Sequence, residues 1–263
     1  MHLFDQDITV TPKEPYFFKG HVSDNWSING NPNGGYLLAL VASAMVKHSD
    51  KTATPILTAN YLARCMPGDV ELGVEAMAQS KQFNRFQTRL LQEGTEKIRA
   101  FGTFAIDTDE CFVKRYEAGP PEIAPLDKCI GFPKMPKYTL YDNMEVRMDP
   151  ECAGWMENRL SDKSEHKGYI RFRDKRSVDL FAVTLAADAF PPAVFSTQGM
   201  AAWVPTLEFS ISIRNITDTE WLKCRFRTRF INCGLLEEDG EIWDENNELI
   251  AVSRQIAQYR KII

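Results

Sequence analysis

This 263-residue chain has few histidines and no closely spaced pair of cysteines, which argues against several kinds of metal site and catalytic site. The four histidines, at positions 2, 21, 48 and 166, are too scattered to suggest a zinc site or a catalytic triad. The six cysteines form no CxxC pair, and the sequence holds no GxSxG nucleophile elbow. We therefore expect neither a metal centre nor a serine nucleophile of the elbow type.

The sequence also lacks a recognisable targeting or membrane segment. No positively charged leader with an apolar core precedes MHLFDQDITVTP, and the longest apolar stretches, Tyr36–Val46 and Leu180–Ala187, are too short to span a bilayer. We expect a cytoplasmic protein with free thiols and no membrane partner. The formal net charge of -5 argues against nucleic acid as a partner but allows a local basic site for an anionic ligand.

The most apolar element of the chain runs from Arg176 to Gly199. Its centre, Leu180–Ala187, is apolar all round, as expected of a buried helix. Ser177 is the predicted N-cap, and Pro191-Pro192 ends the helix because proline cannot continue one. One carboxylate, Asp188, lies near the C-terminal end, where an acid is costly unless it is partnered or used. Asp188 is therefore either a surface acid that turns toward solvent or a functional one.

Branched and aromatic segments predict strands on both sides of this helix. The first half is predicted to hold one strand and a helix, followed by four strands, at 16–28, 36–48, 55–64, 70–78, 86–91 and 97–106. The second half is predicted to hold a strand pair, the apolar helix and further strands, at 156–173, 205–213, 221–230, 240–243 and 248–258. The pattern indicates an α+β fold with mostly antiparallel strands.

A proline-rich segment separates the halves. Residues 117–150 contain six of the 14 prolines, which favours an extended linker over a packed element. The predicted division is an N-terminal domain at 1–116, the linker at 117–150 and a C-terminal domain at 151–263.

The second half repeats the order of the first. Pro55-Ile56-Leu57 matches Pro205-Thr206-Leu207 at an offset of 150, and Ala100–Ile106 matches Ala251–Ala257 at 151. A repeat of such length suggests a duplicated domain, each copy being a long helix wrapped by an antiparallel sheet. The alternative is a chance likeness between two αβ halves.

Four short motifs in this order resemble the double-hotdog acyl-CoA thioesterases, the group of bacterial acyl-CoA thioesterase II. They are Asn33-Gly34-Gly35-Tyr36, Ala187-Asp188 with Pro191-Pro192, Pro205-Thr206-Leu207 and Ser253-Arg254-Gln255. The likeness covers most of the chain outside the linker. It implies two tandem hotdog copies, acyl-CoA as the substrate, no cofactor and a homo-oligomer.

The resemblance also implies a catalytic site formed by Asp188, Thr206 and Gln255, which hold one water against the thioester. A carboxylate can take a proton from that water, and a hydroxyl and an amide can fix its position. Each of the three has a plain structural interpretation as well. At the offsets above, their counterparts in the first half are Leu38, Ile56 and Phe104, so only one half would keep a site.

Two further features are candidates for substrate binding. Asn33, Gly34 and Gly35 lie where a helix begins, so their N–H groups can face an anion or a carbonyl oxygen, unless the glycines only serve a tight turn. Arg225 and Arg227, with Lys223 and Arg229, share one face of a strand. They suit the phosphates of coenzyme A, and the alternative is a solvated outer face.

The predicted function is hydrolysis of acyl-CoA thioesters. One rival is a non-catalytic protein that binds acyl thioesters or lipids on the same fold. A second is an enoyl-thioester hydratase or dehydratase, which would be expected to use an Asp–His pair, although no histidine lies near Asp188 in the sequence. The sequence leaves open the acyl chain and the choice between coenzyme A and an acyl carrier protein as donor.

Overall fold

One antiparallel sheet carries strands from both halves of the chain, in a computed structural model that describes residues 1–107 and 113–261. The first half contributes β1 (Thr11–Glu14), β2 (Phe17–Val22), β5 (Ala53–Tyr61), β6 (Gly68–Gln79), β7 (Phe83–Gln92) and β8 (Thr95–Ala105). The second contributes β9 (Ile130–Gly131), β10 (Met144–Met148), β11 (Ser164–Phe172), β13 (Thr206–Ile213), β14 (Leu222–Thr228), β15 (Ile231–Asn232), β16 (Leu235–Trp243) and β17 (Leu249–Gln258).

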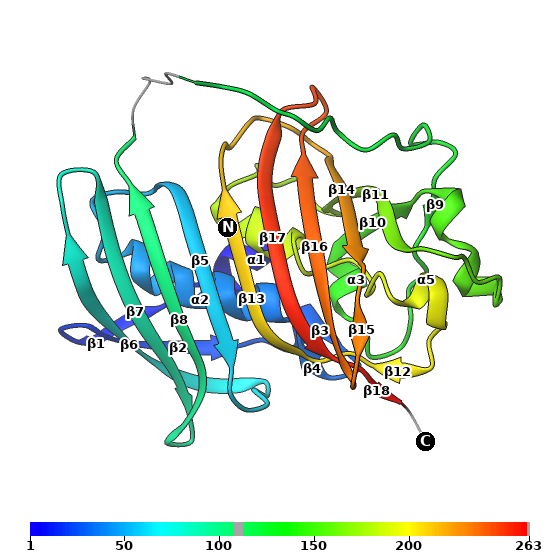
Figure 1. Cartoon of the computed structure of the whole chain (residues 1–263). Helices are drawn as coiled ribbons and strands as arrows, with labels where there is room; N and C mark the ends of the chain where they lie inside the picture. The colour runs from blue at the N-terminus through cyan, green and yellow to red at the C-terminus, as the bar shows by residue number, and fades with distance from the viewer. Residues whose placement is uncertain (108–112, 262–263) are drawn as a thin grey trace.

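Across the sheet the order is β1-β2-β6-β7-β8-β5-β13-β17-β16-β14-β11-β10-β9, with β15 paired to β16 (Figure 1). The two halves meet at β5 and β13, where Ala59 lies opposite Phe209 and the Thr58 and Ser210 hydroxyls are 3.0 Å apart. The sheet therefore continues from one half into the other without a break.

The four strands predicted after the first helix are confirmed, with shifts of up to three residues at their ends. The strand predicted at 16–28 is shorter, because β2 ends at Val22 and a 3₁₀ turn and a separate two-residue strand follow it. The hairpin between β7 and β8 turns at Glu93 and Gly94, whose φ angles of 52° and 72° are both positive. Two positive φ angles fit a turn whose twist matches that of the flanking strands, and glycine adopts one of them without steric cost.

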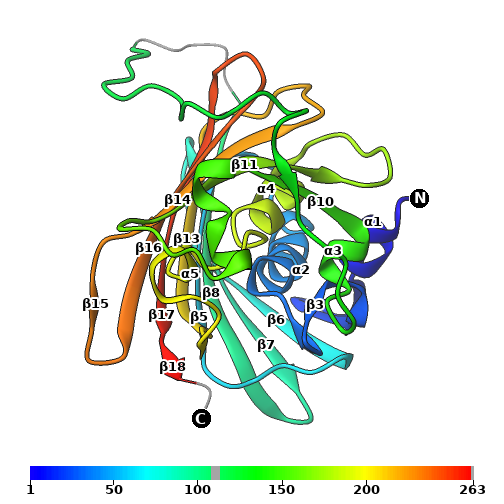
Figure 2. The ribbon, with the colours of Figure 1, turned by 90° about the vertical axis from the view of Figure 1, so that its right-hand side faces the viewer.

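Two helices lie against one side of the sheet, next to each other (Figure 2). They are α2 (Gly34–Val46) and α4 (Leu180–Ala186), and nearly all of their residues are buried because both are apolar all round. The helix cap predicted at Ser177 is wrong, since Asp179 caps α4 by accepting a hydrogen bond from the Ala182 N–H at 2.8 Å. The side chain of Asn33 caps α2 in the same way through the Tyr36 N–H.

The helices touch at a glycine. A Cβ atom built on Gly35 would lie 2.6 Å from the Thr184 carbonyl oxygen and 3.0 Å from the Asp188 Cβ. Only a residue without a side chain allows the backbones to approach this closely. Gly35 thereby brings the N-terminal end of α2 to the C-terminal end of α4.

Short elements complete the fold. They are α1 (Leu3–Asp7), α3 (Leu140–Asn143), α5 (Phe195–Gln198), three 3₁₀ turns (Asp24–Trp26, Pro150–Cys152, Gly154–Glu157), the pair β3 (Ser27–Ile28) and β4 (Asn31–Pro32), and the pair β12 (Ala202–Trp203) and β18 (Arg260–Lys261). The strand pair predicted at 156–173 is a 3₁₀ turn followed by the single strand β11.

The linker predicted at 117–150 is extended only in its first part. Its second part forms α3 and β10, and β10 pairs with β9 and β11 in the sheet with four of its five residues buried. The apolar side chains Met144, Val146 and Met148 explain this packing, because they join the core despite the neighbouring prolines.

Among residues 1–107 and 113–261, no helix is long and apolar enough to cross a membrane. That same part of the chain contains no cluster of three or more histidine, cysteine, aspartate or glutamate side chains placed to hold a metal ion. The described cysteines at 65, 129, 152, 224 and 233 are all free thiols, and Cys111 lies outside the described residues.

Candidate active site

Asp188 follows directly on α4 and projects onto the first turn of α2. Its Oδ2 accepts hydrogen bonds from the Gly35 N–H at 2.9 Å and from the Asn33 Nδ2 at 3.0 Å. The same Asn33 amide donates to the Asp188 backbone carbonyl at 2.7 Å, which fixes the chain on which the carboxyl is carried. The Asn33–Gly35 turn therefore holds a carboxyl of the protein itself at a helix N-terminus.

The Asp188 carboxyl has a raised pKa, which suits it to proton transfer near neutral pH. Burial raises the pKa of this carboxyl from 3.8 to about 6, against the opposing effect of the Gly35 and Gly34 N–H groups and the Asn33 and Gln255 amides. The Gly35 N–H and the Asn33 amide both donate to Oδ2, which leaves acceptor capacity on Oδ1, and the residue lines a cavity. A base with acceptor capacity beside a cavity can accept a proton from a bound molecule.

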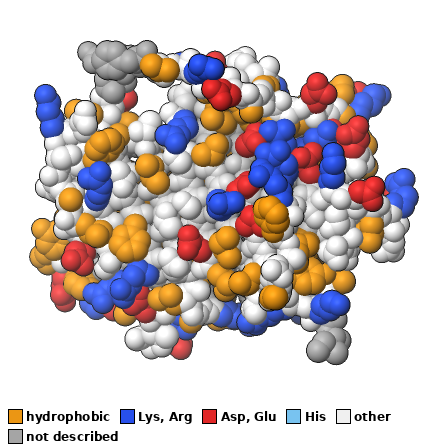
Figure 3. Space-filling view, in the orientation of Figure 1, with side chains coloured by type: hydrophobic (Ala, Val, Ile, Leu, Met, Phe, Trp, Pro, Cys, Tyr) orange, Lys and Arg blue, Asp and Glu red, His pale blue; other side chains and the backbone are white. Residues whose placement is uncertain are grey.

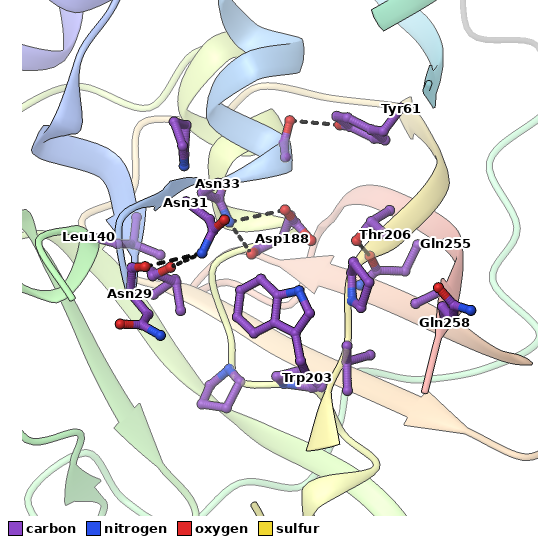
Figure 4. Close-up of a pocket in the computed structure, with 18 of the residues that line it drawn as sticks. Asn29, Asn31, Asn33, Tyr61, Leu140, Asp188, Trp203, Thr206, Gln255 and Gln258 are labelled. Atoms are coloured by element: carbon purple, nitrogen blue, oxygen red, sulfur yellow. Dashed lines mark hydrogen bonds between the residues drawn. The ribbon is translucent and has the colours of Figure 1, made fainter. Parts of the chain in front are cut away.

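Thr206 and Gln255 lie beside this carboxyl as a bonded pair (Figure 4). Thr206 begins β13 and Gln255 lies on β17, the next strand in the sheet. The Thr206 hydroxyl donates to the Gln255 Oε1 at 2.7 Å. The structure thus brings together the three side chains that the sequence predicts as catalytic.

A second carboxyl of this site, Glu238, was missed in the sequence. It lies on β16 opposite Gln255, is 4% exposed and accepts a hydrogen bond from the Gln255 Nε2 at 3.0 Å. Burial, together with the nearby Asp188 charge, raises its pKa to about 7 against the opposing effect of the Ala193 N–H and the Gln255 amide. A signal was present, because the period of two that puts Leu236 and Ile242 in the core also turns Glu238 inward.

Tyr61 is another residue that the sequence did not single out. Its hydroxyl donates to the Gly34 carbonyl at 2.7 Å, and burial together with the Asp188 charge raises its pKa well above the usual value. Tyr61 follows the buried residues Leu57 and Ala59 at a period of two, which would have predicted an inward orientation. Its bond supports the first turn of α2 under Asp188.

The cavity in front of these residues has a volume of about 530 Å³ and is lined from both halves of the chain. The polar residues that line it include Asp188, Thr206, Gln255, Glu238, Asn33 and Gly34. Apolar side chains form much of the remaining wall, including Leu37, Phe132, Trp155, Phe190 and Phe195. A mostly apolar cavity with a few converging polar groups suits a ligand that has a long hydrocarbon part.

Two arginines, Arg64 and Arg260, are the cations that line this cavity within the described residues. Both are exposed, and neither makes an ion pair with another residue that the structure describes. Arg260 lies opposite Trp203 in the β12–β18 pair, and Arg64 follows the end of β5. Each guanidinium donates one hydrogen bond to a neutral oxygen, Arg64 to the Gly30 carbonyl and Arg260 to the Gln258 side chain, and has further N–H groups for an anionic ligand.

Arg225 and Arg227, in contrast, do not line the cavity. They lie on the face of β14 opposite to the buried Cys224 and Phe226, as the predicted alternation requires. Arg225 pairs with Glu241 at 2.6 Å and Arg227 pairs with the same carboxylate at 3.0 Å. Figure 3 shows Lys and Arg side chains mixed with Asp and Glu on this face of the sheet. The row is an ion-pair network on the outer face of the sheet.

The sequence matches known protein families over both halves of the chain. The family of the acyl-CoA thioesterase C-terminal domain matches residues 120–259, and that of the acyl-CoA thioesterase N-terminal domain matches residues 22–105. The chain belongs to the acyl-CoA thioesterase family. The family match begins at residue 120, inside the segment predicted as linker, in keeping with the packing of β10 into the sheet.

Solved structures show the same fold for this family member. A protein described as a thioesterase II from Thermobifida fusca matches at 24% identity with a TM-score of 0.91, over 99% of this chain and 98% of that chain. A hot dog fold protein from Alicyclobacillus acidocaldarius matches at 19% identity with a TM-score of 0.90, over the full length of both chains. An acyl-CoA thioesterase II from Mycobacterium marinum matches at 17% identity with a TM-score of 0.78, over 98% of each chain. The chain therefore has an α+β hotdog fold. A comparison with curated protein sequences gives no significant match.

Proposed function

We propose that this protein hydrolyses acyl-CoA thioesters with a water molecule held between Asp188, Thr206 and Gln255. One observation carries the proposal: the Asp188 carboxyl and the Thr206–Gln255 pair line the same cavity of a thioesterase-family chain. The apolar wall suits the acyl chain, and the reaction needs no group that the described side chains cannot supply.

The chemical steps follow from the donors and acceptors present. Asp188 takes a proton from the water while the water oxygen forms a bond to the thioester carbonyl carbon. The tetrahedral intermediate then collapses, the carbon–sulfur bond breaks, and the thiolate leaves with the electron pair. The proton on Asp188 returns to the thiolate or passes to solvent, which restores the base. Thr206 and Gln255 act by orienting the water, since they have no charge to transfer.

We further propose that the two halves are tandem hotdog copies related by a twofold axis at the β5–β13 pair. The antiparallel β5–β13 ladder supports such an axis, because a twofold axis perpendicular to a sheet relates the two strands of an antiparallel pair. The offsets of 150 and 151, and with them the counterparts Leu38, Ile56 and Phe104, rest on the sequence motifs.

The hydratase alternative has little support in the geometry. Of the described histidines, none lines the cavity that holds Asp188. His166 is buried on β11 with its Nδ1 bonded to the Pro191 carbonyl at 2.9 Å, and burial lowers its pKa to about 4. An imidazole in that place has no access to a ligand beside Asp188.

Thiol release from a panel of acyl-CoAs tests the proposal. We expect release with at least one chain length, and release from the same substrate by Glu151→Gln, which changes an exposed acid remote from the cavity. Binding of acyl-CoA without any thiol release would contradict hydrolysis and favour the non-catalytic binder.

The phosphates of coenzyme A are proposed to bind Arg64 and Arg260. Because charge-assisted hydrogen bonds contribute about 1.5–3 kcal/mol each, Arg64→Ala and Arg260→Ala should each raise KM for acyl-CoA about 10-fold or more. A short thioester without coenzyme A should show unchanged KM. The matched control is Arg225→Ala, which removes an arginine of the outer face. A larger KM effect from Arg225→Ala would instead assign the phosphates to β14, as the sequence suggested.

A further inference from the structure

Glu238 is a buried carboxyl for which the proposed reaction has no assigned step. It is 4% exposed, and both of its oxygens accept hydrogen bonds. Oε1 accepts from the Gln255 Nε2 at 3.0 Å, and Oε2 accepts from the Ala193 N–H at 2.6 Å. Ala193 lies directly after the Pro191-Pro192 segment that lines the cavity, so Glu238 joins this segment to β17.

An ionised carboxylate accepts hydrogen bonds and cannot donate them. A side-chain amide has a donor end and an acceptor end, so the contact with Glu238 selects one of the two orientations of Gln255. When Glu238 is ionised, the Nε2 group faces it, which leaves Oε1 facing Thr206. With the amide turned over, Oε1 would lie against the carboxylate oxygen and repel it.

The orientation of Gln255 decides in turn what Thr206 offers to the cavity. Because the Thr206 hydroxyl donates to Oε1, its lone pairs are left to accept a hydrogen bond. A water that donates one proton to Asp188 and the other to Thr206 has its own lone pair free for the thioester carbon. If the amide were turned over, Nε2 would donate to Thr206, and the hydroxyl proton would compete for that lone pair.

We propose that Glu238 is a positioning residue that fixes the amide of Gln255, and through Thr206 the orientation of the attacking water. This inference rests on the proposed hydrolysis. Glu238 touches neither water nor substrate in this scheme. Its effect passes from β16 to β17 to β13 through two hydrogen bonds between neighbouring strands.

Glu238→Gln tests the inference because it keeps the shape and changes one end of the side chain from acceptor to donor. The Ala193 N–H still needs an acceptor, so the oxygen of the introduced amide should face Ala193 and its NH₂ group should face Gln255. Gln255 should then turn over. We expect kcat to fall about 10- to 100-fold with KM nearly unchanged, because the water is misplaced and the substrate site is not.

The control is Glu237→Gln, the same change at the preceding residue. Glu237 is also buried, but its Oε1 accepts from the Arg229 and Phe230 N–H groups and it does not line the cavity. Glu237→Gln should keep the wild-type kcat.

The double change Glu238→Gln with Gln255→Glu should recover part of the lost kcat, since it restores an acceptor facing Thr206. Wild-type kcat in folded Glu238→Gln, or an equal loss in Glu237→Gln, would overturn the inference.

An NMR measurement tests this inference independently of thiol release. The side-chain amide signals of Gln255 can be assigned in a nitrogen–proton NMR spectrum by their absence in Gln255→Leu. At pH 8, where Glu238 is ionised, we expect one Nε2 proton to be slow to exchange, and Glu238→Gln to shift this pair of signals. A wild-type protein that releases no thiol would end the hydrolysis proposal and the role of Glu238 in orienting the water, while a shifted signal pair in Glu238→Gln would still show that Glu238 fixes the amide of Gln255. An unshifted signal pair in Glu238→Gln would end the positioning proposal alone.

Discussion

Asp188→Asn is expected to lower kcat by about 10²–10⁴-fold with KM near the wild-type value, the range that removal of a general base usually gives. Asparagine keeps the shape, and its oxygen can still accept from Gly35 and Asn33 as Oδ2 does. Only the basic oxygen that faces the cavity is lost. Thiol release measured at saturating acyl-CoA checks the result.

The control for this change is a carboxylate of similar burial outside the cavity. Asp149 is 2% exposed and accepts hydrogen bonds from the Glu151 and Ala124 N–H groups, so Asp149→Asn removes a buried charge without touching the reaction. It should retain kcat. Full activity in folded Asp188→Asn would remove Asp188 as the base.

The pH dependence of kcat/KM in the wild-type protein should also show that Asp188 acts as the base. A base works in its ionised form, so kcat/KM should rise with pH through a midpoint near the pKa of Asp188, about 6, and fall as the pH drops below it. Glu238, with a pKa of about 7, should steepen or displace that limb, because the two carboxyls influence each other. A limb near pH 4 would mean that burial does not raise the pKa of the base.

Asp188→Asn should also stabilise the protein at neutral pH. The folded-state pKa of Asp188 lies above its ordinary 3.8, so its contribution to stability is greatest when the carboxyl is protonated and declines as the pH rises toward 6. Above pH 6 the buried charge should lower the free energy of unfolding by about 1–3 kcal/mol, and a neutral asparagine should not have this effect. Melting curves at pH 8 should show a higher Tm for the variant, and curves at pH 4 should nearly coincide.

Gly35→Ala is expected to remove activity and lower the Tm together. The added Cβ would meet the Thr184 carbonyl oxygen at 2.6 Å and the Leu185 carbonyl oxygen at 3.1 Å, and backbone atoms of a buried helix cannot move aside easily. Overpacking of this kind lowers the free energy of unfolding by about 1–3 kcal/mol, or the Tm by about 2–12 °C for a chain of this size. Because α2 must shift away from Asp188, kcat should fall about 100-fold.

The matched change is Gly119→Ala, since a Cβ on Gly119 meets no atom within 4 Å. It should leave both Tm and kcat at wild-type values. Retention of activity in Gly35→Ala with a lowered Tm would show that the close approach of the helices serves stability and does not hold the base in place.

Local pattern was enough to predict most elements, whereas the set of Asp188, Thr206 and Gln255 came from the resemblance to a family. Alternation in β14 correctly placed Arg225 and Arg227 together on one face, yet it carries no information about which face lines a cavity. Asp188 stood out because an acid at the end of an apolar helix needs a partner. That partner, the N-terminal turn with Gly35, lies 153 residues away and could not be read from spacing.

Glu238 escaped prediction for a related reason. Its role depends on the register that places it opposite Gln255, and a slip of one residue would turn it to the other face of the sheet. The packing of β10 was missed because proline density outweighed a short apolar run, although Met144, Val146 and Met148 follow a strand period. Contacts that depend on pairing between distant strands are the part that single-sequence patterns do not contain.

The junction of β5 and β13 has a consequence for synthesis on the ribosome. Thr58 and its bonded partner Ser210 are 152 residues apart, so β5 leaves the ribosome long before β13 exists. At a translation rate of about 5–20 residues per second, β13 is synthesised about 8–30 s after β5, and the edge of β5 stays unpaired during that time. During that interval the growing chains of a polysome present identical open edges to one another. Slower translation between β5 and β13 should therefore increase aggregation of the nascent chains, and chaperone binding to this edge should reduce it.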